Sequence, residues 1–242
     1  MKKRKINNFV KLKNEPDVSR LYLYGDISDF DESYTISAKK VIEALEKVET
    51  DDLEIHLNSY GGDMFEGIAI SNYLKDSGKN VVVVIDGIAA SAASIVAMAG
   101  NTIKMPKNAE LMIHNPWTLA IGNSSELRKI ADDMDKAQTS LEETYMSRFN
   151  GSREELQELL ENETYLTADE ALELGLCDEV IDSVQDEVPE TVSISDYTFD
   201  ELVQKVAAKI KPATVEVEET VETPKEVPAK AENKILRLLI KE

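Results

Sequence analysis

Residues 81–100 combine the pattern of a buried strand with a serine placed at a sharp turn. The run V-V-V-V-I, Val81–Ile85, predicts a fully buried strand, and Asp86-Gly87 is expected to end it. Ser91 then precedes a segment of small residues that reads as a helix. Free N–H groups and the helix dipole at such a helix start favour developing negative charge, which suits a nucleophile with an oxyanion hole. The alternative is that residues 89–93 are small only because a helix packs closely there.

A second strand-to-helix turn lies upstream and contains two adjacent glycines. Residues 52–58 alternate as a half-buried strand does, and the chain then reads N-S-Y-G-G-D before a helix expected over 64–75. Phe65, Ile68, Ala69 and Leu74 are spaced for one buried face of that helix. Glycine N–H groups at such a turn can point at an oxyanion, although an ordinary turn explains the glycines equally well.

The chain holds two histidines, and their positions differ. His56 lies in the middle of the first strand, on the face opposite its apolar residues, which favours a structural role. His114 ends the apolar run L-M-I just before Asn115-Pro116, where a regular strand must stop. A base at a strand end can reach a neighbouring loop, but a lone histidine is more often structural.

Taken together and in order, the motifs N-S-x-G-G, G-x-A-A-S and M-I-H-x-P resemble those of the Clp protease proteolytic subunit family. The later stretch E-T-Y-L-T-A-D-E-A, followed by G-L-C-D, is similar to a fourth motif of that family. The resemblance covers about residues 21–182. It implies an α/β fold of the ClpP/crotonase-like type, with repeated β-β-α units and a projecting handle helix, and it implies a serine peptidase.

The resemblance also implies roles for individual residues. Ser91 would be the nucleophile, His114 the base, and Glu163 the acid, at a position where the usual family member has Asp. A serine hydroxyl needs an adjacent base, and the acid holds the imidazole in its working tautomer; Glu serves this purpose in other triads. The backbone N–H groups of Gly62 and Ala92 would form the oxyanion hole.

Ser94 is the competing nucleophile, because it follows Ser91 by three residues. It would lie almost one helical turn inside the helix, whereas Ser91 stands at the turn itself. The motif position favours Ser91.

Composition restricts the class of protein further. The net charge of −20 argues against a nucleic-acid surface, and no apolar run reaches the roughly 18 residues of a membrane span. The basic start of the chain lacks the apolar stretch of a secretory signal, and the single Cys177 excludes an intramolecular disulfide. No G-K-[ST] motif follows the small residues near Ser91, so we expect no nucleotide site, cofactor or metal. These features favour a cytoplasmic enzyme.

The chain divides into three predicted parts: a basic N-terminal arm (1–20), a peptidase domain (21–182) and an acidic, partly disordered extension (183–242). Within the domain we expect further strands over 20–25, 101–104 and 110–114. Further helices are expected over 37–47, 124–149, 152–161 and 167–174.

The helix expected over 124–149 is long and amphipathic. By the resemblance it is the handle of a homo-oligomer built from stacked heptameric rings. The extension contains an apolar cluster, Ile235–Ile240, which is either a sticky end or a docking peptide.

The arm and the extension favour the phage and prophage head maturation proteases within this resemblance, which process capsid and scaffold precursors. Two alternatives stay open: a housekeeping-type proteolytic chamber working with an AAA+ unfoldase, and a non-catalytic assembly protein on the same fold. The related crotonase fold acts on acyl-CoA substrates through paired N–H groups, but it would not require Ser91 and His114 together.

Overall fold

The structure is a computed structural model of the whole chain, and it describes residues 6–30 and 35–183. The strands are β1 (Phe9–Asn14), β2 (Ser19–Ile27), β3 (Asp52–Gly62), β4 (Asn80–Ala90), β5 (Thr102–Pro106), β6 (Glu110–Ile113), β7 (Thr164–Thr167) and β8 (Glu179–Ile181). The helices are α1 (Ala38–Leu45), α2 (Met64–Asp76), α3 (Ala92–Ala97), α4 (Ser124–Met146), α5 (Arg153–Glu161) and α6 (Ala168–Glu173).

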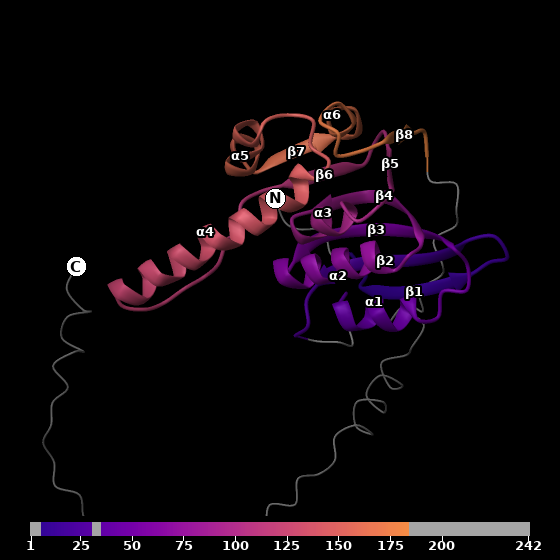
Figure 1. Cartoon of the computed structure of the whole chain (residues 1–242), viewed down its shortest axis with the longest axis horizontal. Helices are drawn as coiled ribbons and strands as arrows, with labels where there is room; N and C mark the ends of the chain where they lie inside the picture. Colours follow the sequence, from indigo (N-terminus) through magenta and orange to yellow (C-terminus); the bar gives the residue numbers. More distant parts are fainter. Residues whose placement is uncertain (1–5, 31–34, 184–242) are drawn as a thin grey trace, which may run out of the picture. The chain divides into compact units, whose positions relative to one another are not determined.

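The strands form one sheet in the order β1-β2-β3-β4-β5-β8 (Figure 1). From β2 to β8 the neighbours run parallel, and β1 joins the edge antiparallel to β2. Strand β6 pairs with the second half of β4 in parallel, and β7 pairs with β6 antiparallel. This mixed α/β architecture of repeated strand–helix units confirms the predicted fold class.

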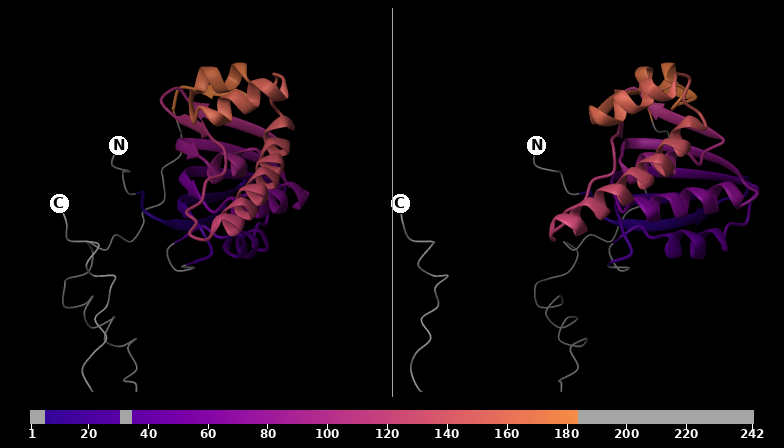
Figure 2. Two further views of the ribbon diagram at one scale, coloured as in Figure 1. Left: turned by 90° about the vertical axis from the view of Figure 1, so that its left-hand side faces the viewer. Right: turned by 60° about the vertical axis from the view of Figure 1, so that its left-hand side comes forward.

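The apolar core lies between the sheet and its helices. Alternate residues such as Leu21, Ile55 and Val83 are fully buried in this core, because a strand turns successive side chains to opposite faces. Helices α1 and α2 lie along this side of the sheet (Figure 2). The intervening residues point to the opposite face, where the side chains are polar as well as apolar. Parallel strands feeding helices bring all their carboxyl ends to one edge of the sheet, which is the usual place for a site.

Strand β4 corrects the expectation that Asp86-Gly87 ends the strand. The strand continues to Ala90, but its neighbour changes: Val82–Val84 pair with β5, and Ile88–Ala90 pair with β6. At the change, the β3–β4 register shifts and the side chain of Asn58 accepts a hydrogen bond from the N–H of Ile88 at 3.3 Å. The break in the apolar pattern therefore marks a change of partner rather than the end of the strand.

Helix α2 begins where expected, at Met64, and it buries Leu74 as expected, whereas Phe65 is 65% exposed. Its other buried positions are Gly67, Ile70 and Ser71. A Cβ atom on Gly67 would lie 2.8 Å from the carbonyl oxygen of Ala92. The close approach of α3 at this glycine sets which face of α2 is buried, and apolar spacing alone does not reveal it.

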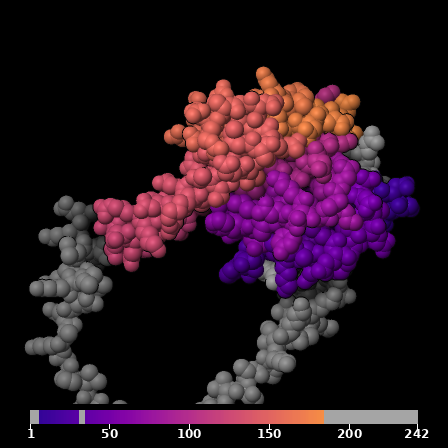
Figure 3. Space-filling view, viewed as in Figure 1, coloured from indigo at the N-terminus to yellow at the C-terminus, as the bar shows by residue number. Residues whose placement is uncertain are grey.

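Helix α4 projects from the body of the described domain as a handle (Figures 1 and 3). It begins at Ser124 with a capping box between Asn123 and Glu126, where the sequence shows its N-terminal signals. Its last turns are anchored, since Leu141 and Tyr145 are buried in the core. Its N-terminal half lies mostly exposed on the projecting part.

Strand β1 was not foreseen, because residues 9–14 fall within the predicted basic arm and show only a weak apolar alternation. The helices expected over 152–161 and 167–174 are α5 and α6, and each begins with a capping box, formed by Ser152 with Glu155 and by Thr167 with Glu170. Among the described residues, no helix is both long and apolar enough to span a membrane. The predicted extension, including Ile235–Ile240, lies outside the described residues apart from Ser183.

Candidate active site

Ser91 occupies a strained turn between β4 and α3. Its backbone has φ 56° and ψ −125°, a conformation that non-glycine residues rarely adopt and that the surroundings must hold. The N–H of Ser91 donates to the carbonyl oxygen of Met112 at 2.9 Å, which fastens the turn to β6. Its side chain makes no capping bond to α3, so the hydroxyl points elsewhere.

That hydroxyl meets the imidazole of His114. Strand β6 runs parallel to the end of β4, so the carboxyl ends of the two strands, and the residues that follow them, lie side by side. The Nε2 atom of His114 lies 2.7 Å from Oγ of Ser91, and both side chains are partly exposed. This distance lies within the range required for a general base to take a proton from a hydroxyl.

Glu163 lies immediately before β7. Extending the antiparallel β6–β7 register by one residue beyond the Ile113–Thr164 pair places the backbone of Glu163 opposite His114. Glu163 has a left-handed backbone conformation, with φ 49°, and its side chain is exposed. The sheet therefore brings the third candidate to the same corner as the other two, while its role as the acid stays a prediction.

Asp178, another acidic residue near this motif, is bonded to groups outside the site. The Oδ2 atom of Asp178 accepts a hydrogen bond from the N–H of Ile103 at 2.7 Å and pairs with the guanidinium of Arg148. Asp178 thus ties the segment that follows α4 to β5. Glu163, at the register position of His114, is the better placed carboxylate.

The strand expected over residues 52–58 continues to Gly62, so the two glycines form the end of β3, paired with β2, and they approach the serine turn closely. A Cβ atom on Gly61 would lie 2.4 Å from the carbonyl oxygen of Ala90 and 2.8 Å from the backbone nitrogen of Ala92. Ala92 is the first residue of α3, where an N–H has no partner within the helix. Gly62 is exposed, with φ 147°, and stands one residue beyond this contact. The N–H groups predicted for an oxyanion hole therefore belong to the end of β3 and to the serine turn, which are in direct contact.

Ser94 is fully buried, in contrast to Ser91. Its hydroxyl donates to the carbonyl oxygen of Ser91 at 2.6 Å and lies 2.6 Å from the hydroxyl of Tyr145. A hydroxyl enclosed in this way has no access to a substrate, so the geometry favours Ser91 over Ser94.

His56 lies on the sheet face opposite α2 and is 1% exposed. Its Nδ1 atom lies 2.9 Å from Oδ1 of Asp86, its Nε2 atom lies 3.2 Å from Oε1 of Glu54, and its ring stacks on Tyr22. Burial lowers the pKa of His56, but the hydrogen bonds to Asp86 and Glu54 outweigh burial and raise it to about 9. The hydrogen bond from His56, opposed by burial and aided by Arg20, lowers the pKa of Glu54 to about 2.

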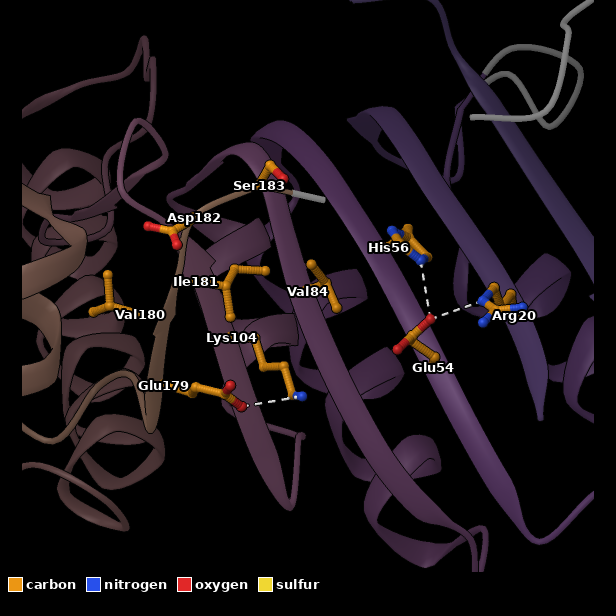
Figure 4. A pocket seen from close by; sticks show the side chains of 10 residues that line it. All are labelled: Arg20, Glu54, His56, Val84, Lys104, Glu179, Val180, Ile181, Asp182 and Ser183. Atoms are coloured by element: carbon orange, nitrogen blue, oxygen red, sulfur yellow. Dashed lines mark hydrogen bonds and ion pairs between the residues drawn. The ribbon is translucent and has the colours of Figure 1, made fainter. Parts of the chain in front are cut away.

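This cluster lines part of a polar cavity of about 540 Å³ on the same face (Figure 4). Glu54 lies between His56 and Arg20, and a second ion pair joins Lys104 to Glu179 at 3.0 Å across β5 and β8. The cavity wall includes neither Ser91 nor His114. Within residues 6–30 and 35–183, no group of His, Cys, Asp and Glu side chains is arranged to hold a metal ion.

A strained serine between a parallel strand and a helix, bonded to a histidine at the end of the neighbouring strand, is the arrangement found in serine hydrolases. The family described as Clp protease matches residues 12–184, which is most of the chain and includes all the elements described above except β1, of which it covers the last residues. The chain belongs to the Clp protease family. Members of this family are serine-type peptidases that act on protein substrates and form oligomers.

Proposed function

We propose that the protein is a serine endopeptidase in which Ser91 is the nucleophile, His114 the general base and Glu163 the acid. The hydrogen bond of 2.7 Å between Nε2 of His114 and Oγ of Ser91 carries this proposal. When the hydroxyl attacks the scissile carbonyl carbon, His114 takes its proton and the carbonyl oxygen becomes an oxyanion. Glu163 would accept a hydrogen bond from the other ring nitrogen and stabilise the imidazolium.

The N–H groups of Gly62 and Ala92 would then bind the oxyanion. His114 returns its proton to the leaving amine, and a water molecule, deprotonated by the same imidazole, hydrolyses the acyl-enzyme. Each step uses only groups near the carboxyl ends of β3, β4 and β6, where the serine turn lies. Loss of a single oxyanion donor typically costs about 10²–10³ in turnover.

A fluorophosphonate probe tests the nucleophile directly, because it reacts with activated serines. We expect peptide mapping of the full chain to show the label on Ser91 and not on Ser94. Labelling is expected to be lost in His114→Ala and kept in His56→Gln. A label on Ser94, or equal labelling of the His114→Ala variant, would contradict the assignment.

For the substrate, we propose the precursor proteins of a phage or prophage head, with the reaction in the host cytoplasm or in the assembling prohead. The proposal is supported by the basic residues at the start of the chain and by the acidic sequence that follows the matched region, residues 185–242. Incubation with the capsid precursor encoded beside this protein should yield defined fragments with the wild type and none with Ser91→Ala. Processing that requires an added AAA+ unfoldase would instead indicate a housekeeping-type chamber, and no processing with either would indicate an assembly protein.

We further propose that the handle packs against other copies of the chain, in stacked heptameric rings. Three large apolar side chains lead into α4 and are exposed: Trp117 (75%), Leu119 (85%) and Ile121 (94%). They precede α4, which projects from the domain (Figure 3) and on which Leu127 is also 42% exposed. Apolar side chains gathered on an exposed surface are typical of a protein–protein contact. Light scattering should show an oligomer, and a monomer with full peptidase activity would contradict this assembly.

Truncation after residue 184 tests the part played by the extension. The removed residues follow the matched region, so we expect small-peptide hydrolysis to be unchanged. Processing of, or assembly with, the capsid precursor should decrease. Equal processing by the truncated protein would show that the extension is passive, and loss of peptide hydrolysis would show that it belongs to the catalytic domain.

A further inference from the structure

A chain of hydrogen bonds joins the handle helix to the serine turn. Tyr145, on α4, is fully buried, and its hydroxyl oxygen lies 2.6 Å from Oγ of Ser94. Oγ of Ser94 lies in turn 2.6 Å from the carbonyl oxygen of Ser91. Neither Tyr145 nor Ser94 lies where it could touch a substrate, yet together they reach the backbone of the proposed nucleophile.

The direction of these bonds follows from the number of protons. The carbonyl oxygen of Ser91 can only accept, so the hydroxyl of Ser94 donates its single proton to it. The hydroxyl of Tyr145 must then donate to Oγ of Ser94. Burial raises the pKa of Tyr145, which keeps that proton in place at neutral pH. Hydrogen bonds that run in one direction polarise and strengthen each other in a buried setting.

The held carbonyl belongs to the same peptide unit as the N–H of Ala92. A peptide unit is planar and trans, so its C=O and its N–H point in opposite directions. Fixing the Ser91 carbonyl toward Ser94 and Tyr145 therefore fixes the direction of the Ala92 N–H away from them. The same carbonyl also accepts the N–H of Ser94 at 2.9 Å, and the N–H of Ser91 is held by Met112.

We propose that Tyr145 and Ser94 are positioning residues that aim the Ala92 N–H at the oxyanion and hold Ser91 in its strained conformation. This inference rests on the proposed function, because it assigns a part of the same catalytic site. A turn with φ 56° persists only where its surroundings over-determine it, and the Tyr145–Ser94 pair supplies that constraint from the α4 side.

The α4 end of this chain of hydrogen bonds is held in place by further contacts. Arg148, three residues after Tyr145, donates to the carbonyl oxygen of Gly100 at 2.9 Å and pairs with Asp178. The buried Glu142, three residues before Tyr145, accepts from Arg153 at 3.1 Å and from Gln157 at 3.0 Å. The C-terminal end of α4 is therefore held by hydrogen bonds and ion pairs on both sides of Tyr145. These contacts fix the position of the tyrosine hydroxyl relative to the serine turn.

The test compares Tyr145→Phe, Ser94→Ala and the double variant in the full-length chain. Each removes one hydroxyl and leaves the packing of the core unchanged in outline. Tyr24→Phe is the matched control for the tyrosine, because its buried hydroxyl donates to Asp86 at 2.5 Å on the opposite sheet face. Ser71→Ala is the control for the serine, because it removes a buried hydroxyl of α2 for which the described residues supply no hydrogen-bond partner.

The measurements are kcat and KM for a small peptide, the affinity of a peptide boronate, and the rate of fluorophosphonate labelling. A boronate forms a tetrahedral adduct with the serine and mimics the transition state, so its affinity should fall in parallel with kcat. We expect kcat to fall about tenfold in either single variant, less than the loss of a whole oxyanion donor, with KM changed by less than about twofold. The kcat of the double variant should be little lower than that of either single variant, because both hydroxyls belong to one chain of hydrogen bonds.

The two controls should keep the wild-type kcat and boronate affinity, even where their melting temperatures fall. Wild-type values in Tyr145→Phe and Ser94→Ala, or equal losses in the controls, would overturn the inference while leaving Ser91 as the nucleophile. If Tyr145→Phe and Ser94→Ala raised KM and left kcat unchanged, the inference would also be overturned. A wild-type protein that is not labelled at Ser91 would instead overturn the proposed function, and the inference with it.

Discussion

His56 lies within a parallel strand of the sheet and His114 directly follows another, and the two rings bond to different kinds of oxygen atom. His56 lies in the middle of β3 between the carboxylates of Asp86 and Glu54, and it is buried. His114 follows the end of β6, is partly exposed, and contacts the hydroxyl of Ser91. Carboxylate acceptors beside both ring nitrogens of His56 favour its doubly protonated imidazolium form.

The comparison shows how position on a strand decides the chemistry of the same side chain. An imidazolium with a pKa of about 9 is already protonated at neutral pH, so His56 cannot act as a base there. A histidine beside a neutral hydroxyl at a strand end has a proton to take and a route for a substrate. The middle of the sheet supplies partners from both neighbouring strands, whereas the carboxyl edge leaves one side open.

The largest expected effect separates the two histidines by activity. His114→Ala and Ser91→Ala should each reduce kcat for a small peptide by about 10⁴-fold or more, and the double variant should be no worse, because the two form one proton-transfer unit. His56→Gln should keep kcat within about twofold at pH 7 under the same assay. Wild-type turnover in His114→Ala, or a comparable loss in His56→Gln, would reverse the assignment of the two histidines.

The next largest effect concerns Glu163, the carboxylate proposed to act beside the ring of His114. Glu163→Gln should lower kcat by about 10³-fold without lowering the melting temperature, because the amide cannot stabilise the imidazolium of His114. Asp169→Asn, a nearby exposed acid in the first turn of α6, is the matched control and should be silent. Full activity in Glu163→Gln would move the search for the acid to Asp169.

A smaller loss is expected when the contact between the end of β3 and the serine turn is disturbed. Gly61→Ala would place a Cβ atom 2.4 Å from the carbonyl oxygen of Ala90, so the serine turn must shift and kcat should fall about 10²-fold. Gly78→Ala has a similar positive φ, 70°, but no atom lies within 4 Å of its Cβ position. It should lose only about 1–2 kcal/mol of stability through backbone strain and keep its kcat. Equal kcat in the two variants would argue against a close-packed oxyanion site.

The smallest effect on activity, and a clear one on stability, is expected at His56. Its pKa is raised from 6.5 to about 9, so its contribution to stability is complete below pH 6.5 and is lost as the pH rises through 9. The pKa of Glu54 is lowered from 4.5 to about 2, so its contribution is present above pH 4.5 and is lost as the pH falls through 2. Breaking this buried pairing in His56→Gln should cost on the order of 3 kcal/mol at pH 6.

Thermal melts from pH 5 to pH 10 test whether the stabilisation by His56 decreases as the pH rises. In a domain of this size the loss corresponds to about 6–12 °C in Tm at pH 6. The difference between wild type and His56→Gln should shrink toward pH 10, where the wild-type histidine is neutral. A difference that grows with pH would show that His56 is buried in its neutral form.

The sequence alone predicted the α/β class, the helices at 64–75, 124–149 and 152–161, and the residues at the serine turn. These features depend on local pattern: β-branched runs, capping boxes and glycine pairs carry their own physical cause within a few residues. The order of the motifs along the chain further indicated the family. Strand β1 and the continuation of β4 past Asp86-Gly87 were missed, because pairing partners rather than local propensity decide both.

Only the tertiary structure decided which polar groups meet. The parallel pairing of β4 with β6 places His114 at 2.7 Å from Ser91, across 23 residues of chain, whereas the packing around β3 places His56 between Asp86 and Glu54. The same packing turns Ser94 from a competing nucleophile into a buried link to Tyr145, 51 residues away. A sequence specifies side chains and local geometry, but the distance between two reactive atoms depends on strand register and helix packing, which are set by the burial of the whole core.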